Sequence, residues 1–121
     1  MLHFFKDRLK SLIFVFKGLF LLIRTENAIK AQIAIFSLFL LLGFYFEISR
    51  EDWIIQIFCM GLILTAEGLN TAVEKLCDFV HPDYHKKIGF IKDISSGAVG
   101  FAALASIIIV GMIYAKYCSF L

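Results

Sequence analysis

Three carboxylates and one amide recur at helical spacing in one stretch of the chain, at Glu67, Asn70, Glu74 and Asp78. At about 100° per residue, these positions fall on a stripe roughly 80° wide. The fourteen residues from Trp53 to Ala66 that precede them carry no charged side chain, as is typical of a membrane-spanning helix. With Trp53 at the outer interface, Glu67 is expected about 9 Å inside the apolar layer, Glu74 at its boundary and Asp78 in water. Such a gradient suits a reaction between a lipid headgroup and a soluble reagent.

An ionisable side chain inside a membrane is costly, by at least about 2.5 to 3.5 kcal/mol, and usually lines a functional cavity or meets a partner. Glu67 is therefore predicted to be functional. Asp78 is equally consistent with a solvated helix end. A different class of protein also fits the stripe: a non-catalytic membrane scaffold or small transporter subunit, in which the carboxylates pair across helices or relay protons.

The residue types on the stripe and around it suit phosphoryl transfer. Glu26 and Glu74, from two different helices, are hard oxygen ligands of the kind that Mg²⁺ shares with water and substrate phosphates. Lys92 can neutralise phosphate charge. Glu67 can act as a general base on a hydroxyl that enters from the bilayer. Together these groups indicate transfer from a metal-bound nucleotide to a lipid alcohol, a reaction that depends on positioning and charge neutralisation.

Two features weigh on this interpretation. The chain contains no glycine-rich phosphate-binding loop, so neither common nucleotide-binding fold is indicated. A rival metal site consists of Cys77, His81 and His85, which would share a face of a continuous helix. Pro82 interrupts that helix, and three ligands are fewer than a structural zinc site uses, so this alternative is weak.

The elements that must position these groups are transmembrane helices. The chain has 121 residues, 60% of them hydrophobic, which places it in the membrane class as one domain over 1–121. Uncharged runs predict spanning helices at 27–46, 52–78 and 92–117, with polar links at 47–52 and 79–93. The net charge of +2 indicates no nucleic-acid surface, and three irregularly spaced cysteines argue against a disulfide framework.

The first 24 residues differ from the spans, because basic side chains alternate with Phe and Leu throughout them. This pattern predicts an amphipathic surface helix over 2–24, and no signal peptide is evident. Thr25 is expected to cap the next helix, with Glu26 in its first turn. The 47–52 link is acidic and the N-terminus basic, so the positive-inside rule places the N-terminus in the cytoplasm. Small residues in the first half of the last span predict close helix packing.

The order of these motifs resembles the bacterial integral-membrane diacylglycerol kinase and undecaprenol kinase family. The resemblance rests on the run Glu67-Gly-Leu-Asn70-Thr-Ala-Val-Glu74, on Asp83-Tyr84-His85 and on Lys92-Asp93, and it covers nearly the whole chain. It implies a homotrimer in the cytoplasmic (inner) membrane, each chain having a surface helix and three spans. It also implies use of Mg-ATP to phosphorylate diacylglycerol to phosphatidic acid, or undecaprenol to undecaprenyl phosphate.

The resemblance also implies roles for individual residues. Glu67 corresponds to the catalytic base and Asn70 to its neighbour, and Ser96 joins Glu67 at the lipid site. Glu26 and Glu74 correspond to the metal ligands on the ATP phosphates. The remaining ATP contacts implied are Arg8, Asp83, Tyr84, His85, Lys92 and Asp93. An alternative alignment puts Asp7 at the position of Arg8. Ala31, with Gln32 beside it, stands where the family can carry a lipid-side glutamine, so substrate choice stays open.

Overall fold

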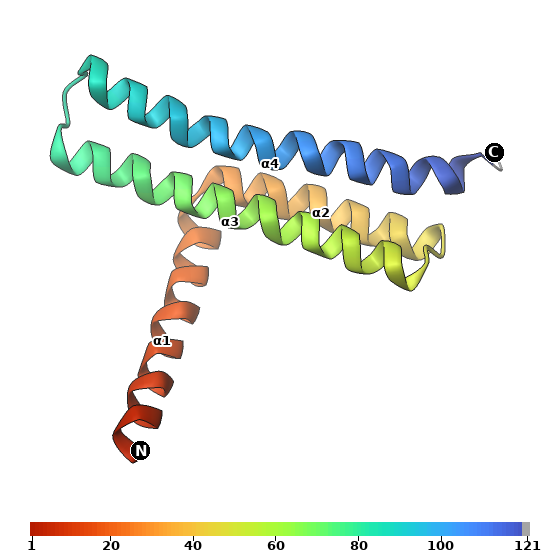
Figure 1. The fold of residues 1–121 in the computed structure, drawn as a ribbon, viewed down its shortest axis with the longest axis horizontal. Helices are drawn as coiled ribbons and strands as arrows, with labels where there is room; N and C mark the ends of the chain where they lie inside the picture. The colour runs from red at the N-terminus through yellow and green to blue at the C-terminus, as the bar shows by residue number, and fades with distance from the viewer. Residues whose placement is uncertain (120–121) are drawn as a thin grey trace.

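The computed structural model describes residues 1–119, which form four helices: α1 (Leu2–Thr25), α2 (Asn27–Tyr45), α3 (Arg50–Val80) and α4 (Lys86–Cys118). The last three lie side by side as an elongated bundle, and α1 leaves it at a steep angle (Figure 1). By length and composition, α2, α3 and α4 are each able to cross a membrane. The prediction of an all-helical protein with three spans is therefore confirmed.

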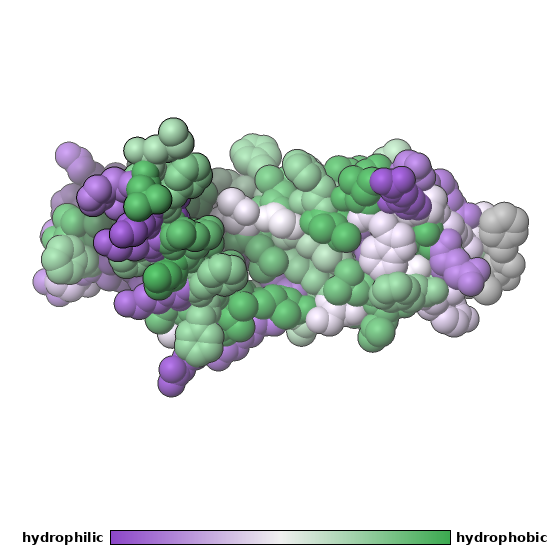
Figure 2. Space-filling view, turned by 90° about the horizontal axis from the view of Figure 1, so that it is seen from below, coloured by the Kyte–Doolittle hydropathy of each residue, from purple (hydrophilic) through white to green (hydrophobic). Residues whose placement is uncertain are grey.

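The surface of the bundle fits this conclusion. Apolar side chains cover its middle and polar ones gather towards its ends (Figure 2). Large apolar residues along α3 and α4 point outward, among them Phe58, 72% exposed, and Phe101, 80% exposed. In water this exposure would be unfavourable, whereas in a bilayer the same faces meet hydrocarbon. The outer surface of the bundle is therefore made for lipid contact.

The break between α1 and α2 is a single residue, Glu26, in an extended conformation. The prediction that Thr25 caps the second helix is wrong. Thr25 is the last residue of α1, and its hydroxyl donates to the carbonyl of Leu21 at 2.6 Å. The side-chain hydroxyl is thus used inside α1, because a Thr in a helix can satisfy itself against the preceding turn. Glu26 itself occupies the cap position of α2.

The links between the spans are shorter than expected. Ser49 caps α3 by accepting from the backbone N–H of Asp52, so the helix begins at Arg50, two residues before the predicted start. Glu51 and Asp52 thereby fall in the first turn, where acidic groups favour the helix dipole. The predicted polar link over 79–93 contracts to 81–85, because α4 already begins at Lys86. Polarity marks where a helix leaves the membrane, and this helix continues beyond that boundary.

Gly43 allows a close approach of Trp53 in the α2–α3 hairpin. A Cβ atom at this position would lie 2.6 and 2.7 Å from two ring carbons of Trp53. That ring is itself packed on Phe44, with 4.9 Å between centroids. Replacing Gly43 with Ala is expected to destabilise the protein by about 1 to 3 kcal/mol, because overpacking forces the ring or the backbone to move. Thermal unfolding in detergent measures this loss.

Gly61 provides a matched control for that substitution. It also lies in a spanning helix, but a Cβ atom there would meet no other atom within 4 Å. Gly61→Ala is expected to be neutral or to stabilise by up to about 1 kcal/mol through helix propensity. Equal melting temperatures for the two variants would contradict the tight packing at Gly43.

Candidate active site

The polar stripe of α3 is continuous, because the helix runs without interruption from Arg50 to Val80. Asn70 donates from its side-chain nitrogen to Glu74 Oε1 at 3.1 Å, which joins two successive turns of the stripe. Glu67 lies one turn further into the apolar part and is half-buried. The side-chain oxygen Oδ1 of Asn70 is buried without a hydrogen-bond partner. The stripe thus presents an unused acceptor beside two carboxylates.

Lys92 reaches the stripe from α4. Its ammonium group donates to Asp78 Oδ1 at 2.6 Å. Asp78, for which the sequence left two interpretations open, therefore orients the lysine that was predicted to meet phosphate. Asp93 and Ser96 follow on the same helix, and both are exposed.

The antiparallel pairing of α3 and α4 fixes which residues lie at the same level. Tyr114 contacts Gln56 near the N-terminal end of α3, and Lys92 contacts Asp78 near its C-terminal end. A step along α3 is matched by an opposite step along α4, so Ala103 lies level with Glu67 and Ser96 with Glu74. Ser96 thus stands about two turns from the level of Glu67 within one chain, at a rise of about 1.5 Å per residue.

Glu26 reaches α3 beside the stripe. Its Oε1 atom lies 3.2 Å from the ammonium group of Lys75, and its side chain is 21% exposed. Lys75 follows Glu74 directly and is turned from it by about 100° around the helix. The two predicted metal ligands therefore lie near the same part of α3, and the carboxylate of Glu26 is paired with Lys75.

The remaining predicted nucleotide contacts lie at the ends of elements. Arg8 stacks on Phe4, 5.1 Å from the ring centroid, in the part of α1 that points away from the bundle (Figure 1). Asp83, Tyr84 and His85 are exposed in the α3–α4 loop. The ring atom Nδ1 of His85 accepts from the backbone of Lys87 and so caps α4. A single chain does not bring Arg8 to the other residues of the site.

A groove of about 480 Å³ continues the stripe towards the N-terminal end of α3. Its α3 wall contains Gln56 and Ile63, which lie on the same side of the helix as Glu67. Ala103 and Ser106 line it from α4 and Gln32 from α2. The Ser106 hydroxyl is buried without a partner. Sequence reasoning missed this groove, although isolated polar residues inside apolar runs were a usable signal at Gln32 and Gln56.

A second, separate cavity of about 400 Å³ lies at the junction of α1, α2 and α3. Leu22 of α1, Ile29 of α2 and Gly68 of α3 are among its lining residues. Gly68 follows Glu67 directly but faces a different side of α3, so this cavity lies beside the stripe, whereas the first groove lies in line with it.

The oxygen donors near Glu74 fit a hard divalent cation. Glu74 offers a carboxylate, and the buried Oδ1 of Asn70 is an unpaired acceptor next to it. Glu26 already holds a cationic group, the ammonium of Lys75. Within residues 1–119 no three His, Cys, Asp or Glu side chains group together, so substrate phosphates and water would complete the coordination of Mg²⁺. In the rival site of Cys77, His81 and His85, the cysteine is buried. The Nδ1 atom of His81 is hydrogen-bonded to the carbonyl of Asp83, and that of His85 to the backbone N–H of Lys87.

Comparison with known proteins identifies the family. Residues 13–114 match the model of the prokaryotic diacylglycerol kinases. The chain belongs to the prokaryotic diacylglycerol kinase family. One similar protein is the undecaprenol kinase of Bacillus subtilis (strain 168), 32% identical over 100 residues that cover 83% of this chain and 81% of the relative. The predicted family is confirmed, and the chain is a multi-pass membrane lipid kinase that uses ATP.

Proposed function

We propose that this lipid kinase transfers the γ-phosphate of Mg-ATP to the hydroxyl of diacylglycerol, giving phosphatidic acid. The observation that carries the proposal is the polar stripe, in which Asn70 bonds Glu74 and Lys92 reaches α3 beside them. The similar protein named undecaprenol kinase favours a second acceptor, undecaprenol. Both acceptors are alcohols of membrane lipids, so the same residues serve either reaction.

In this mechanism Glu67 takes the proton of the lipid hydroxyl as its oxygen attacks the γ-phosphorus. The bond from the γ-phosphorus to the bridging oxygen breaks, and ADP leaves with that oxygen. Lys92, oriented by Asp78, neutralises charge on the transferred group. Glu26, Glu74 and the Oδ1 of Asn70 would hold Mg²⁺, which neutralises phosphate charge when bound. Asp83, Tyr84 and His85 receive the nucleoside, with Asp93 next to Lys92 and Ser96 on the lipid side.

The same proposal places the N-terminus and α1 on the cytoplasmic face of the inner membrane, where ATP is available. Lys6, Arg8 and Lys10 give α1 the charge that anionic headgroups attract. Two observations support active sites that are shared between the chains of a homotrimer. The N-terminal end of α1, which carries Arg8, points away from the bundle of its own chain. The carboxylate of Glu26 is paired with Lys75 and does not face the stripe of its own chain. Arg8 and Glu26 would then complete the site of a neighbouring chain.

The groove supports a place for the lipid chain. It opens from the level of Glu67, where Ala103 stands, and extends along α3 to Gln56. These eleven residues correspond to roughly 16 Å. The groove is elongated and lined mainly by apolar atoms, which suits a single hydrocarbon chain. We therefore place the chain of the bound lipid alcohol in this groove.

Transfer of labelled γ-phosphate from Mg-ATP tests the function. Purified protein in mixed micelles is given diacylglycerol or undecaprenol, and we expect phosphate on at least one lipid, with the rate ratio identifying the preferred acceptor. Ala103→Phe should raise KM for the lipid by about 5- to 150-fold, because overpacking costs about 1 to 3 kcal/mol. KM for ATP should not change.

Ala105→Phe is the matched control, since Ala105 lies two residues away, is exposed and does not line the groove. It should leave both KM values unchanged. Equal effects of the two variants would remove the lipid chain from the groove. Absence of transfer to either lipid, from folded protein, would contradict the proposed acceptors.

A further inference from the structure

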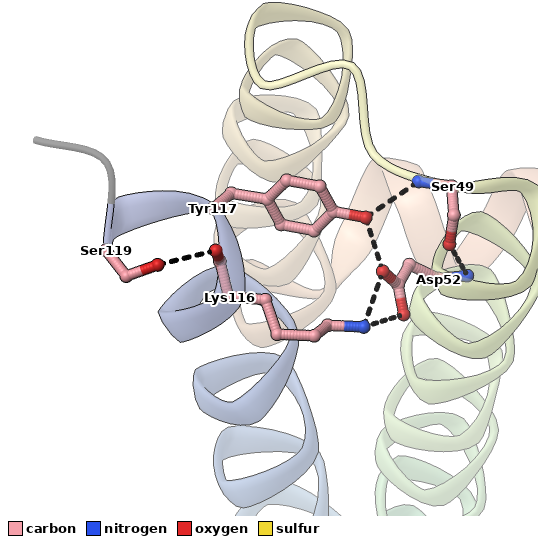
Figure 3. Close-up of polar contacts among 5 residues, drawn as sticks. All are labelled: Ser49, Asp52, Lys116, Tyr117 and Ser119. Atoms are coloured by element: carbon pink, nitrogen blue, oxygen red, sulfur yellow. Dashed lines mark hydrogen bonds and ion pairs between the residues drawn. The ribbon is translucent and has the colours of Figure 1, made fainter.

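The outer end of the bundle contains a polar cluster that the chemistry above does not use. Asp52 of α3 is only 4% exposed, and its carboxylate accepts three hydrogen bonds from two side chains of α4 (Figure 3). Lys116 of α4 donates to its two oxygens at 3.0 and 2.9 Å, and the hydroxyl of Tyr117 donates at 2.6 Å. The same hydroxyl accepts from the backbone of Ser49 at 2.8 Å. Ser49, Asp52, Lys116 and Tyr117 are called the outer clasp below.

A second polar contact lies one turn further in. Gln56 is fully buried, and its amide nitrogen donates to the backbone carbonyl of Phe39 in α2 at 3.2 Å. Its amide oxygen accepts from the hydroxyl of Tyr114 in α4 at 2.6 Å. Together the clasp and this contact link the outer ends of α2, α3 and α4. The part of the α3–α4 interface that lies between the Gln56–Tyr114 contact and the Asp78–Lys92 contact is mainly apolar.

That apolar interface determines the axial position of α4 poorly. Ala98, Ala102 and Ser106 repeat at four-residue spacing, so a shift of one turn brings a similar small side chain to the same place. In lipid, moreover, apolar burial does not favour one helix arrangement over another. Buried ion pairs contribute little net stability, but polar contacts can select one arrangement among several. The outer clasp has this property.

We propose that the outer clasp sets the axial register of α3 against α4 and thereby positions Lys92 and Ser96 at the opposite end. Asp52 and Asp78 are 26 residues apart on one helix, or about 39 Å. A slip of one turn would displace α4 by about 5.4 Å, which separates Lys92 from Asp78 and Ser96 from Glu74. Asp52 and Lys116 are therefore positioning residues for the site. That Lys92 and Ser96 belong to the site rests on the proposed function, whereas the register itself does not.

The double variant D52N/K116M tests the proposal, because it removes both charges together and so leaves no unpaired buried charge. Its matched control is R50M/E51Q, which removes one charge of each sign from exposed neighbours in the first turn of α3. Register is read by oxidative cross-linking of cysteine pairs, after Cys59, Cys77 and Cys118 are replaced by Ala. Thr71→Cys is combined with Val99→Cys for the observed register, and with Ser95→Cys or Ala103→Cys for slips of one turn.

With the clasp intact, and in the R50M/E51Q control, we expect the 71–99 pair to cross-link in preference to both slipped pairs. In D52N/K116M the 71–99 product should decrease and a slipped product should appear. In the same variant without added cysteines, kcat should fall by up to about 100-fold, the loss that a misplacement of about 1 Å can cause.

An unchanged cross-linking pattern in D52N/K116M would overturn the proposal, and so would a loss of activity with the observed register retained. The swapped pair D52K/K116D serves as a rescue: recovery of the 71–99 product supports a role for the ion pair itself. Cross-linking needs no catalysis. A protein that phosphorylates neither lipid would therefore contradict the proposed function while leaving the register testable.

Discussion

Replacing Glu67 with Gln is expected to lower turnover by about 10²- to 10⁴-fold, the usual contribution of a general acid or base. Gln retains the shape of the side chain and loses the ability to accept the hydroxyl proton. Glu67 lies about one helical turn before Asn70, level with Ala103 of the groove. Nucleotide groups meet other residues, so Mg-ATP binding and chain association should be unchanged. Steady-state phosphoryl transfer, with ATP binding measured separately, checks this expectation.

The matched control is Glu51→Gln, the same chemical change at an exposed residue in the first turn of α3. It should retain the turnover of the parent protein. Near-normal turnover of Glu67→Gln would contradict the general-base role. Loss of ATP binding in the same variant would instead indicate that Glu67 supports the nucleotide site.

Replacing Glu74 with Ala is expected to have the second large effect, on the metal dependence of the reaction. The substitution removes one proposed Mg²⁺ ligand and also the acceptor that holds the Asn70 amide at 3.1 Å. Substitution of residues that only support metal ligands already weakens metal affinity by about 10- to 100-fold. We expect the half-saturating Mg²⁺ concentration to rise by at least about this factor. Binding of Mn²⁺ to the ATP-loaded protein, followed by electron paramagnetic resonance, measures the effect without turnover.

Glu26→Ala should weaken metal binding in the same direction, because it removes the other carboxylate proposed to hold Mg²⁺. Glu51→Ala is the control and should titrate like the parent protein. Unchanged Mg²⁺ and Mn²⁺ titrations in both Glu26→Ala and Glu74→Ala would rule out the ligand roles. The two carboxylates would then have a structural role only.

Much of the fold follows from local sequence pattern. Uncharged runs predicted three spanning helices, and α2, α3 and α4 confirm them. The helix repeat alone places Glu67, Asn70 and Glu74 on one face, because their spacing is fixed once the segment is helical. Helix ends were less predictable: α4 begins at Lys86 because the helix extends past the membrane boundary that polarity marks. The single extended residue Glu26 also left no pattern that distinguished it from Thr25 as the cap.

The sequence by itself therefore determined the membrane class, the three spans, the acidic stripe and, through its motifs, the lipid kinase family. Only the tertiary structure decided that Asp78 holds Lys92, that Glu26 meets Lys75 and that Asp52 is enclosed by Lys116 and Tyr117. Each of these contacts joins two helices, so it depends on their relative rotation and axial position. The small residues Ala98, Ala102 and Ser106 recur every four positions, so this pattern alone does not single out one axial position of α4 against α3.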